Sequence, residues 1–117
     1  MGILDLFKSK SAKVADLDEA VLVQLRKAGS DLTKTHGIEF FLYFPSQSAA
    51  EQTANQIRES GFETRVDRAA QGDSWLCFAT MQMIPDLSSL KKIRQDFNAL
   101  AARNKGEYDG WGTEIVK

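Results

Sequence analysis

Apolar residues recur every three or four positions in some stretches of the chain and alternate or run together in others. The first spacing predicts amphipathic helices, and the second predicts strands. The sequence therefore predicts three helices, each with one apolar face. They cover residues 16–28, 47–60 and 86–105, with apolar stripes at Leu17, Val21, Leu25 and Ala28, then Ala50, Ala54 and Ile57, then Leu90, Ile93, Phe97 and Leu100.

The ends of these helices are marked by capping residues. An Asp or Ser followed three positions later by Glu has the spacing of a capping box, in which both side chains bind free backbone N–H groups at the helix start. A glycine after the last turn ends a helix because it readily takes the left-handed conformation. The capping pairs are Asp16 with Glu19 and Ser48 with Glu51, Asp86 opens the longest helix, and the terminating glycines are Gly29, Gly61 and Gly106.

Strand patterns fill the stretches between the helices. Residues 38–44 are β-branched and aromatic and end at Pro45, which predicts a central strand. Residues 62–68 alternate between apolar and polar side chains, as in a half-exposed antiparallel strand. Residues 75–83 follow a turn and are apolar on both faces, which predicts a hairpin with an interior strand. A last strand is expected over residues 108–116.

The order of these elements indicates the fold. One helix is followed by strand, helix, strand, strand, helix and strand. Two helices with single apolar stripes can cover one face of a four-stranded sheet, and right-handed crossovers favour the split βαβ arrangement. The sequence thus predicts an α+β, ferredoxin-like βαββαβ sandwich: a four-stranded antiparallel sheet with two helices on one face, preceded by an extra N-terminal helix. The last strand should lie at a sheet edge, beside residues 38–44.

This last strand contains Gly110 and Gly112 on either side of Trp111, although glycine weakens a strand interior. Regular alternation puts Asp109, Trp111, Thr113 and Ile115 on one face and Tyr108, Gly110, Gly112, Glu114 and Val116 on the other. If Trp111 and Ile115 join the core, the glycines leave a bare strip on the helix-free face. The alternative is that they permit a β-bulge or make room for Trp111 and Tyr108, and a bulge would change the face assignment.

A bare strip would let another chain approach closely, beside the aromatic side chains of the neighbouring strand. Aromatic residues are enriched at protein interfaces. The candidate protein-binding residues are therefore Phe41, Tyr43, Tyr108, Asp109, Gly110, Gly112 and Glu114. The partner would be another protein, and self-association through the open face or the edge strand is an alternative.

Composition and charge fit one ordered domain. The chain has 117 residues, of which 43% are hydrophobic and 26% charged, which suits a single core. The formal net charge of −1 leaves no general attraction for nucleic-acid phosphates. No apolar run is long enough to span a bilayer, and the single cysteine, Cys77, points to the cytoplasm. We expect one domain over residues 16–117 and a flexible or amphipathic segment over residues 1–15.

The titratable residues give little support for an enzyme. His36 is the only histidine and Cys77 the only cysteine, so neither a metal-ligand spacing nor a nucleophile with its base is visible. Cys77 is expected in the core and His36 in a solvated turn. No catalytic residue, metal site or cofactor is predicted.

RNA binding is a second alternative, because aromatic side chains on the open face of a ferredoxin-like sheet can stack on bases. Phe41, Tyr43 and Phe78 are the residues that would do so. However, Glu39 shares the face of Phe41, and the basic, glycine-containing signature of that module is missing. Direct nucleic-acid binding is therefore disfavoured.

The run "GEYDGWGTE" after the longest helix and the run "AGSD" at the end of the first helix resemble the regulator of ribonuclease E activity B family. The resemblance covers residues 17–117. Its matching positions are Tyr108, Asp109, Gly110, Trp111, Gly112 and Thr113, together with Gly29, Ser30 and Asp31, and we expect structural roles for Trp111, Thr113 and the last three. It implies a bacterial, cytoplasmic, non-catalytic protein that binds ribonuclease E and lowers its cleavage of RNA. Better-known members continue into a strongly acidic tail, which would steer a basic partner segment and which this sequence lacks after Lys117.

Overall fold

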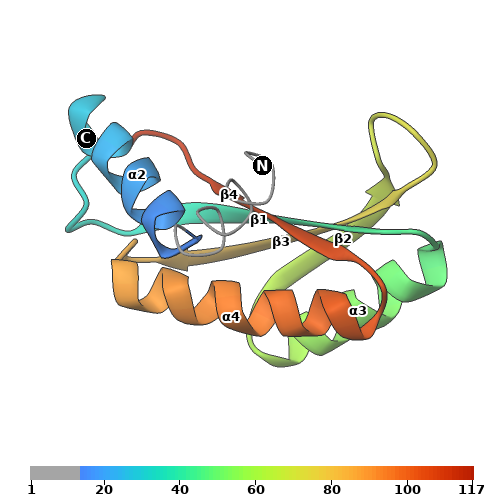
Figure 1. The fold of residues 1–117 in the computed structure, drawn as a ribbon. Helices are drawn as coiled ribbons and strands as arrows, with labels where there is room; N and C mark the ends of the chain where they lie inside the picture. Colours follow the sequence, from blue (N-terminus) through green and yellow to red (C-terminus); the bar gives the residue numbers. More distant parts are fainter. Residues whose placement is uncertain (1–13) are drawn as a thin grey trace, which may run out of the picture.

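The computed structural model describes residues 14–117, and its elements follow the predicted order (Figure 1). They are helix α2 (Val14–Lys27), strand β1 (His36–Phe44), helix α3 (Gln47–Glu59), strand β2 (Glu63–Arg68), strand β3 (Trp75–Met83), helix α4 (Leu87–Arg103) and strand β4 (Glu107–Gly112). The segment predicted over residues 1–15 lies outside the described residues, except for its last two positions, which begin α2.

Within residues 14–117 the strands form a four-stranded antiparallel sheet in the order β2-β3-β1-β4. Helices α3 and α4 cover the same face of this sheet, below it in Figure 1. Helix α2 packs against α4 near one end of the sheet. These observations confirm the α+β, ferredoxin-like prediction, including the edge position of β4 beside β1. We call the sheet face turned away from α3 and α4 the open face.

The core lies between the sheet and these two helices. Alternate β1 side chains enter it, namely Ile38, Phe40, Leu42 and Phe44, and all four are buried. The Phe40 ring packs edge-on against those of Phe62 and Phe97, with centroids 5.6 and 5.4 Å away, a favourable aromatic geometry. Cys77 is also buried, as predicted, and burial raises the pKa of its thiol to about 11. The thiol is therefore protonated at neutral pH.

Two predicted N-caps, Asp16 and Ser48, are wrong, although the second helix starts at residue 47 as predicted. Helix α2 begins at Val14, so Asp16 lies inside the helix and does not cap it. Helix α3 is capped by Ser46, not Ser48, because the extended backbone of Ser46 lets its hydroxyl accept a hydrogen bond from the Ala49 N–H at 3.2 Å. The third predicted N-cap is confirmed, because the carboxylate of Asp86 caps α4.

The apolar face of α2 also differs from the predicted one. The predicted stripe included Leu17, which is 48% exposed. Among residues 17–27 the buried positions are Asp18, Leu22 and Leu25, so the helix is rotated by about one residue from the predicted orientation. A polar residue occupies part of the buried stripe, and a count of apolar residues alone cannot find it.

The glycines that end the helices have two different roles. Gly29 and Gly61 both have φ of +100° and end α2 and α3 in the left-handed region, as predicted. After α4 this conformation belongs to Lys105, with φ of 64°. Gly106 is needed for a different reason: a Cβ there would lie 2.4 Å from the Tyr43 carbonyl oxygen. It lets the chain pass close to the end of β1.

Strand β4 is shorter than predicted. It ends at Gly112, and Ile115 is 40% exposed and does not join the core. The chain beyond β4 instead returns to the connection between α2 and β1, where the backbone N–H of Asp31 donates to the Val116 carbonyl at 2.6 Å. The last four residues of the strand predicted over residues 108–116 thus form an irregular segment, which is held by the connection after α2.

Candidate functional site

A β-bulge lies in the middle of the glycine-containing motif of β4. Phe41 of β1 pairs with Gly110, whereas the next residue, Leu42, pairs with Tyr108. Asp109 is therefore an extra residue on β4. Gly110 has φ of +110°, a conformation that side chains rarely adopt. The bulge alternative from the sequence is thus correct for Gly110.

The bulge turns Tyr108 and Trp111 toward the same face of the sheet. They lie opposite Leu42 and Phe40, on the side of the helices. The open-face position predicted for Tyr108 is wrong, because Asp109 interrupts the regular alternation. The Tyr108 ring packs against Phe97 at 5.7 Å, and burial raises the pKa of its hydroxyl.

Both glycines keep their predicted place on the open face. Gly110 pairs with Phe41, and Gly112 pairs with Glu39. At Gly112 an added Cβ would meet no atom within 4 Å, and the backbone is not left-handed. The fold within residues 14–117 therefore gives no steric reason for glycine at position 112.

The centre of the open face is a strip of apolar and aromatic side chains from β1 and β3. It consists of Phe41, Tyr43, Leu76 and Phe78, which are neighbours in the strand register. The rings of Phe41 and Phe78 are 5.5 Å apart. All four side chains are half-buried, so part of each side chain remains available for contact.

Charged side chains surround this aromatic strip. Strand register places four carboxylates on the open face, from Glu39, Glu63, Asp67 and Glu107. The basic residue among them is Arg65, which pairs with Asp67 at 2.6 Å and lies over the Phe78 ring at 4.8 Å. The open face within the described residues is therefore aromatic at its centre and acidic at its margins.

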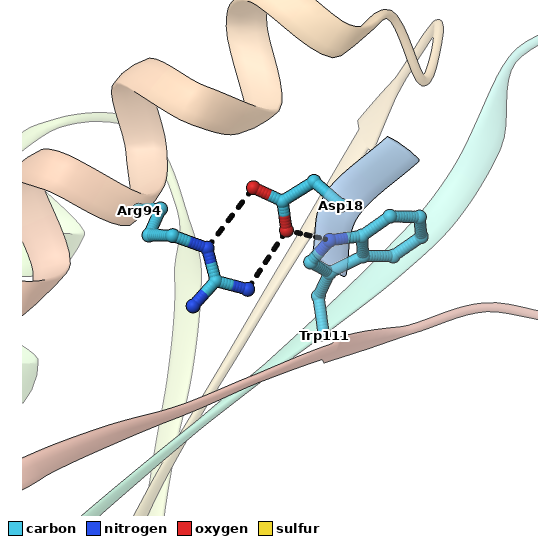
Figure 2. Close-up of polar contacts among 3 residues, drawn as sticks. All are labelled: Asp18, Arg94 and Trp111. Carbon is cyan, nitrogen blue, oxygen red and sulfur yellow. Dashed lines mark hydrogen bonds and ion pairs between the residues drawn. The ribbon is translucent and has the colours of Figure 1, made fainter. Parts of the chain in front are cut away.

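On the other side of β4, Trp111 belongs to a buried polar cluster (Figure 2). Asp18 of α2 is fully buried. It accepts two hydrogen bonds from the Arg94 guanidinium of α4, at 3.0 and 2.8 Å, and a third from the Trp111 indole N–H at 2.9 Å. The pKa of Arg94 is raised, first of all by these bonds to Asp18. The cluster therefore fixes α2 to α4 and β4.

The same cluster also contacts Tyr108, the residue of β4 that precedes the bulge. The Arg94 guanidinium carbon lies 5.1 Å from the centre of the Tyr108 ring, so one arginine contacts both the Asp18 carboxylate and the aromatic residue before the bulge. Sequence reasoning missed Asp18 and Arg94. The available signal was that Asp18 has helical spacing to Leu22 and Leu25, which places a charged residue on an otherwise apolar face.

The run "AGSD" around Ser30, which also resembles the family, holds the segment of the chain that follows β4. His36 Nδ1 faces the Lys34 carbonyl oxygen at 2.8 Å, so Nδ1 carries the proton and Nε2 accepts from the Ser30 hydroxyl at 2.6 Å. The backbone N–H of Val116 donates to the same hydroxyl at 3.0 Å. The predicted solvated position of His36 is wrong: it is fully buried in β1, because Ser30 and Lys34 satisfy both ring nitrogens.

Nearby contacts involve the remaining motif residues. The Asp31 carboxylate accepts hydrogen bonds from the Thr33 hydroxyl and N–H, which lower its pKa. The Thr113 hydroxyl donates to the Gly37 carbonyl at 3.0 Å. Glu114 is exposed beyond the end of β4. Of the candidate residues, Phe41, Tyr43 and the two glycines therefore lie together on the open face. Glu114 lies apart from them, beyond the end of β4.

Asp109 points away from the core at the sheet edge, between two shallow cavities. One, of about 300 Å³, lies between α2 and β4 and is lined by Leu17, Val21 and Trp111 among others. The other, of about 400 Å³, lies between Tyr43, Glu107 and the turn between β2 and β3. Exposed Asp109 is accessible from both sides.

Few of the described side chains are placed so that they could take part in catalysis. Within residues 14–117 no group of three or more His, Cys, Asp or Glu side chains could hold a metal ion. A hydroxyl next to an imidazole can act as a nucleophile with its base, but Ser30 and His36 are both buried under the chain after β4. The helices in this part of the chain are too short and too polar to cross a membrane.

The fold and its surface define a small ferredoxin-like α+β domain with an aromatic, acid-rimmed sheet face. The family model described as "Regulator of ribonuclease activity B" matches residues 15–113, and the chain belongs to this family. A protein of Pseudoalteromonas atlantica (strain T6c / ATCC BAA-1087), named Regulator of ribonuclease activity B, is 24% identical over 112 residues, which cover 92% of this chain and 96% of that protein. The family resemblance found in the sequence is thereby confirmed.

Proposed function

We propose that this chain is a non-catalytic regulator that binds a ribonuclease, with ribonuclease E as the first partner to test, and lowers its cleavage of RNA. The observation that carries the proposal is the match to a family of ribonuclease regulators over residues 15–113. The chain would act in the bacterial cytoplasm, in RNA decay. Regulation would depend on contact between proteins; the single histidine, His36, and the single cysteine, Cys77, are buried.

The proposed contact surface is the open face near β4. Phe41 and Tyr43 supply aromatic area, which is favoured at protein interfaces. Gly110 and Gly112 keep the neighbouring strand bare, so a partner can approach the backbone closely. Exposed Asp109 and Glu114 would lie at the margin of the contact. Tyr108 would act only indirectly, by holding β4 on the core.

A protein partner fits this face better than RNA does. Carboxylates of Glu39, Glu63 and Glu107 would repel phosphate groups. The Phe78 ring, which would be needed for base stacking, is already covered by the Arg65 guanidinium. Nucleic-acid modules of this architecture depend on free aromatic rings and basic neighbours. The same carboxylates favour a cationic protein surface.

The proposal is tested with purified full-length ribonuclease E. Cleavage of a labelled RNA is followed at increasing concentrations of this protein, and direct binding is measured by surface plasmon resonance. We expect the initial rate to fall over the concentration range in which the complex forms. The heat-denatured protein is the control. Unchanged cleavage together with no detectable binding would refute ribonuclease E as the partner.

The same assay tests the non-catalytic role. The protein alone, incubated with the labelled RNA, should leave it intact. RNA fragments that appear with this protein alone, and that disappear when it is removed by antibody, would contradict the proposal. Size-exclusion chromatography with light scattering then shows whether the protein forms a dimer in the absence of the nuclease.

A further inference from the structure

The open face already contains one complete arginine-binding arrangement. The Arg65 guanidinium lies 4.8 Å from the centre of the Phe78 ring and pairs with the Asp67 carboxylate at 2.6 Å. Its guanidinium thus lies over an aromatic ring and contacts an acid, a combination that arginine makes more readily than lysine. This arrangement lies on the β2–β3 half of the sheet.

The β1–β4 half has the same chemistry without an arginine of its own. Phe41 lies beside Phe78, and Tyr43 follows on the same face. A carboxylate lies near each ring: Glu39 precedes Phe41 by two positions on β1, and Glu107 of β4 is directly opposite Tyr43. Both carboxylates are exposed, and neither forms an ion pair within residues 14–117.

The backbone of β4 leaves this half accessible. Gly112 is opposite Glu39, and an added Cβ there would find open space. Gly110, opposite Phe41, likewise presents no side chain. A partner segment can therefore lie along β4 and place its side chains over the rings. Side chains at either glycine would narrow this approach.

We propose that the β1–β4 half of the open face binds an arginine-rich, extended segment of a protein partner. One guanidinium would stack on Phe41 and pair with Glu39, and another would lie over Tyr43 and pair with Glu107. The two acids are separated along β1 by four strand positions, about 13 Å. Arginines four positions apart in an extended segment match this distance. That the segment belongs to a ribonuclease rests on the proposed function; the recognition chemistry does not.

The inference is tested by NMR titration of the isotopically labelled full chain. The probe is a short serine and threonine peptide with two arginines four positions apart. We expect saturable shifts at the amides of Phe41, Tyr43, Gly110 and Gly112. The same peptide with lysines should bind about two- to fivefold more weakly, because lysine cannot stack or form the paired hydrogen bonds. Shifts confined to other surfaces, or equal binding of both peptides, would overturn the inference.

Matched variants test whether Glu39 and Glu107 are the carboxylates that bind the arginines. Glu39→Gln and Glu107→Gln should each weaken arginine-peptide binding about two- to fivefold, the range for an exposed ion pair. Glu59→Gln, an exposed acid at the end of α3, makes the same charge change away from this face and should leave the affinity unchanged. Circular dichroism and thermal unfolding check that the variants fold. Unchanged affinity in the folded double variant E39Q/E107Q would contradict the assignment.

Two further measurements separate this inference from the proposed function. An oligouridylate of similar length should cause no saturable shifts on the open face, and binding there would mean an RNA surface instead. The full-length ribonuclease is then tested with wild type and E39Q/E107Q. Equal binding of the nuclease by both would refute this docking site while leaving the function intact. Peptide binding with no nuclease binding would refute the function while leaving the site intact.

Discussion

The two sides of β4 differ in what they require of the residues in one short motif: one side packs on the core and the other is bare. On the helix side, Trp111 and Tyr108 pack on the core, and the Trp111 indole donates to the buried carboxylate of Asp18. On the open side, Gly110 and Gly112 present bare backbone. The helix side is determined by packing, whereas a Cβ at position 112 on the open side would meet no other atom of residues 14–117 within 4 Å. A motif that matches a family can therefore combine residues needed for folding with residues left for a partner.

The largest expected effect comes from Trp111→Ala on the helix side. It removes a large aromatic side chain and leaves Asp18 with one hydrogen bond fewer. We expect a loss of about 3 to 5 kcal/mol in the free energy of unfolding, as for other large-to-small aromatic changes, measured by urea denaturation. A loss below about 1 kcal/mol would mean that the helix side of β4 contributes little to the fold.

Asp18→Asn is expected to have the next effect. It keeps the shape of the side chain but leaves the Arg94 guanidinium, which is 13% exposed, without its charge partner. Breaking a buried pair from one side costs about 3 to 5 kcal/mol, and some exposure of Arg94 places this one near 3. A double-mutant cycle with Trp111→Phe, which removes only the indole donor, measures the coupling. Independent effects of the two changes would contradict a shared cluster.

Gly110→Ser should have an intermediate effect. The φ of +110° imposes backbone strain on any side chain, although nothing lies within 4 Å of an added Cβ. We expect a loss of about 1 to 3 kcal/mol, again by urea denaturation. If the bulge relaxes without cost, the variant will be as stable as wild type. The fold would then require a glycine neither at position 110 nor at position 112.

Gly112→Ser should have the smallest effect on stability and a clear effect on binding. Its backbone is not left-handed and its surroundings are open, so we expect a change within about 0.5 kcal/mol, typical of surface substitutions. The nuclease affinity, measured by surface plasmon resonance, should fall. Gln52→Ser, at an exposed position of α3, is the control. An undiminished affinity would exclude close contact at Gly112.

Much of the fold could be predicted from periodicity. The order of elements, the interior positions of β1 and β3 and the edge position of β4 follow from apolar spacing and connection rules, because burial drives these features. The capping residues were less predictable than the helices, since Ser46 and Ser48 are both suitable caps and only backbone geometry selects one.

The candidate site was only partly predictable, for two physical reasons. The face of Tyr108 depends on the extra residue Asp109, and regular alternation assumes that no such residue exists. The environments of Asp18 and His36 depend on partners from distant parts of the chain, Arg94, Trp111 and Ser30. Local polarity suggests solvent exposure for both residues, but complete hydrogen bonding allows their burial.

The return of the chain to Ser30 after β4 has a mechanical consequence. A molecular machine that pulls on the chain from beyond Val116 would load the bonds of Lys117 to Lys34 and of Val116 to Ser30 and Asp31 before it loads β4. After they break, β4 would peel from β1 one hydrogen bond at a time, which is a weaker arrangement under force than shearing a strand lengthwise. Ser30→Ala should therefore shorten the time that an ATP-driven protease needs to unravel the domain from this end, and single-turnover degradation assays measure that time.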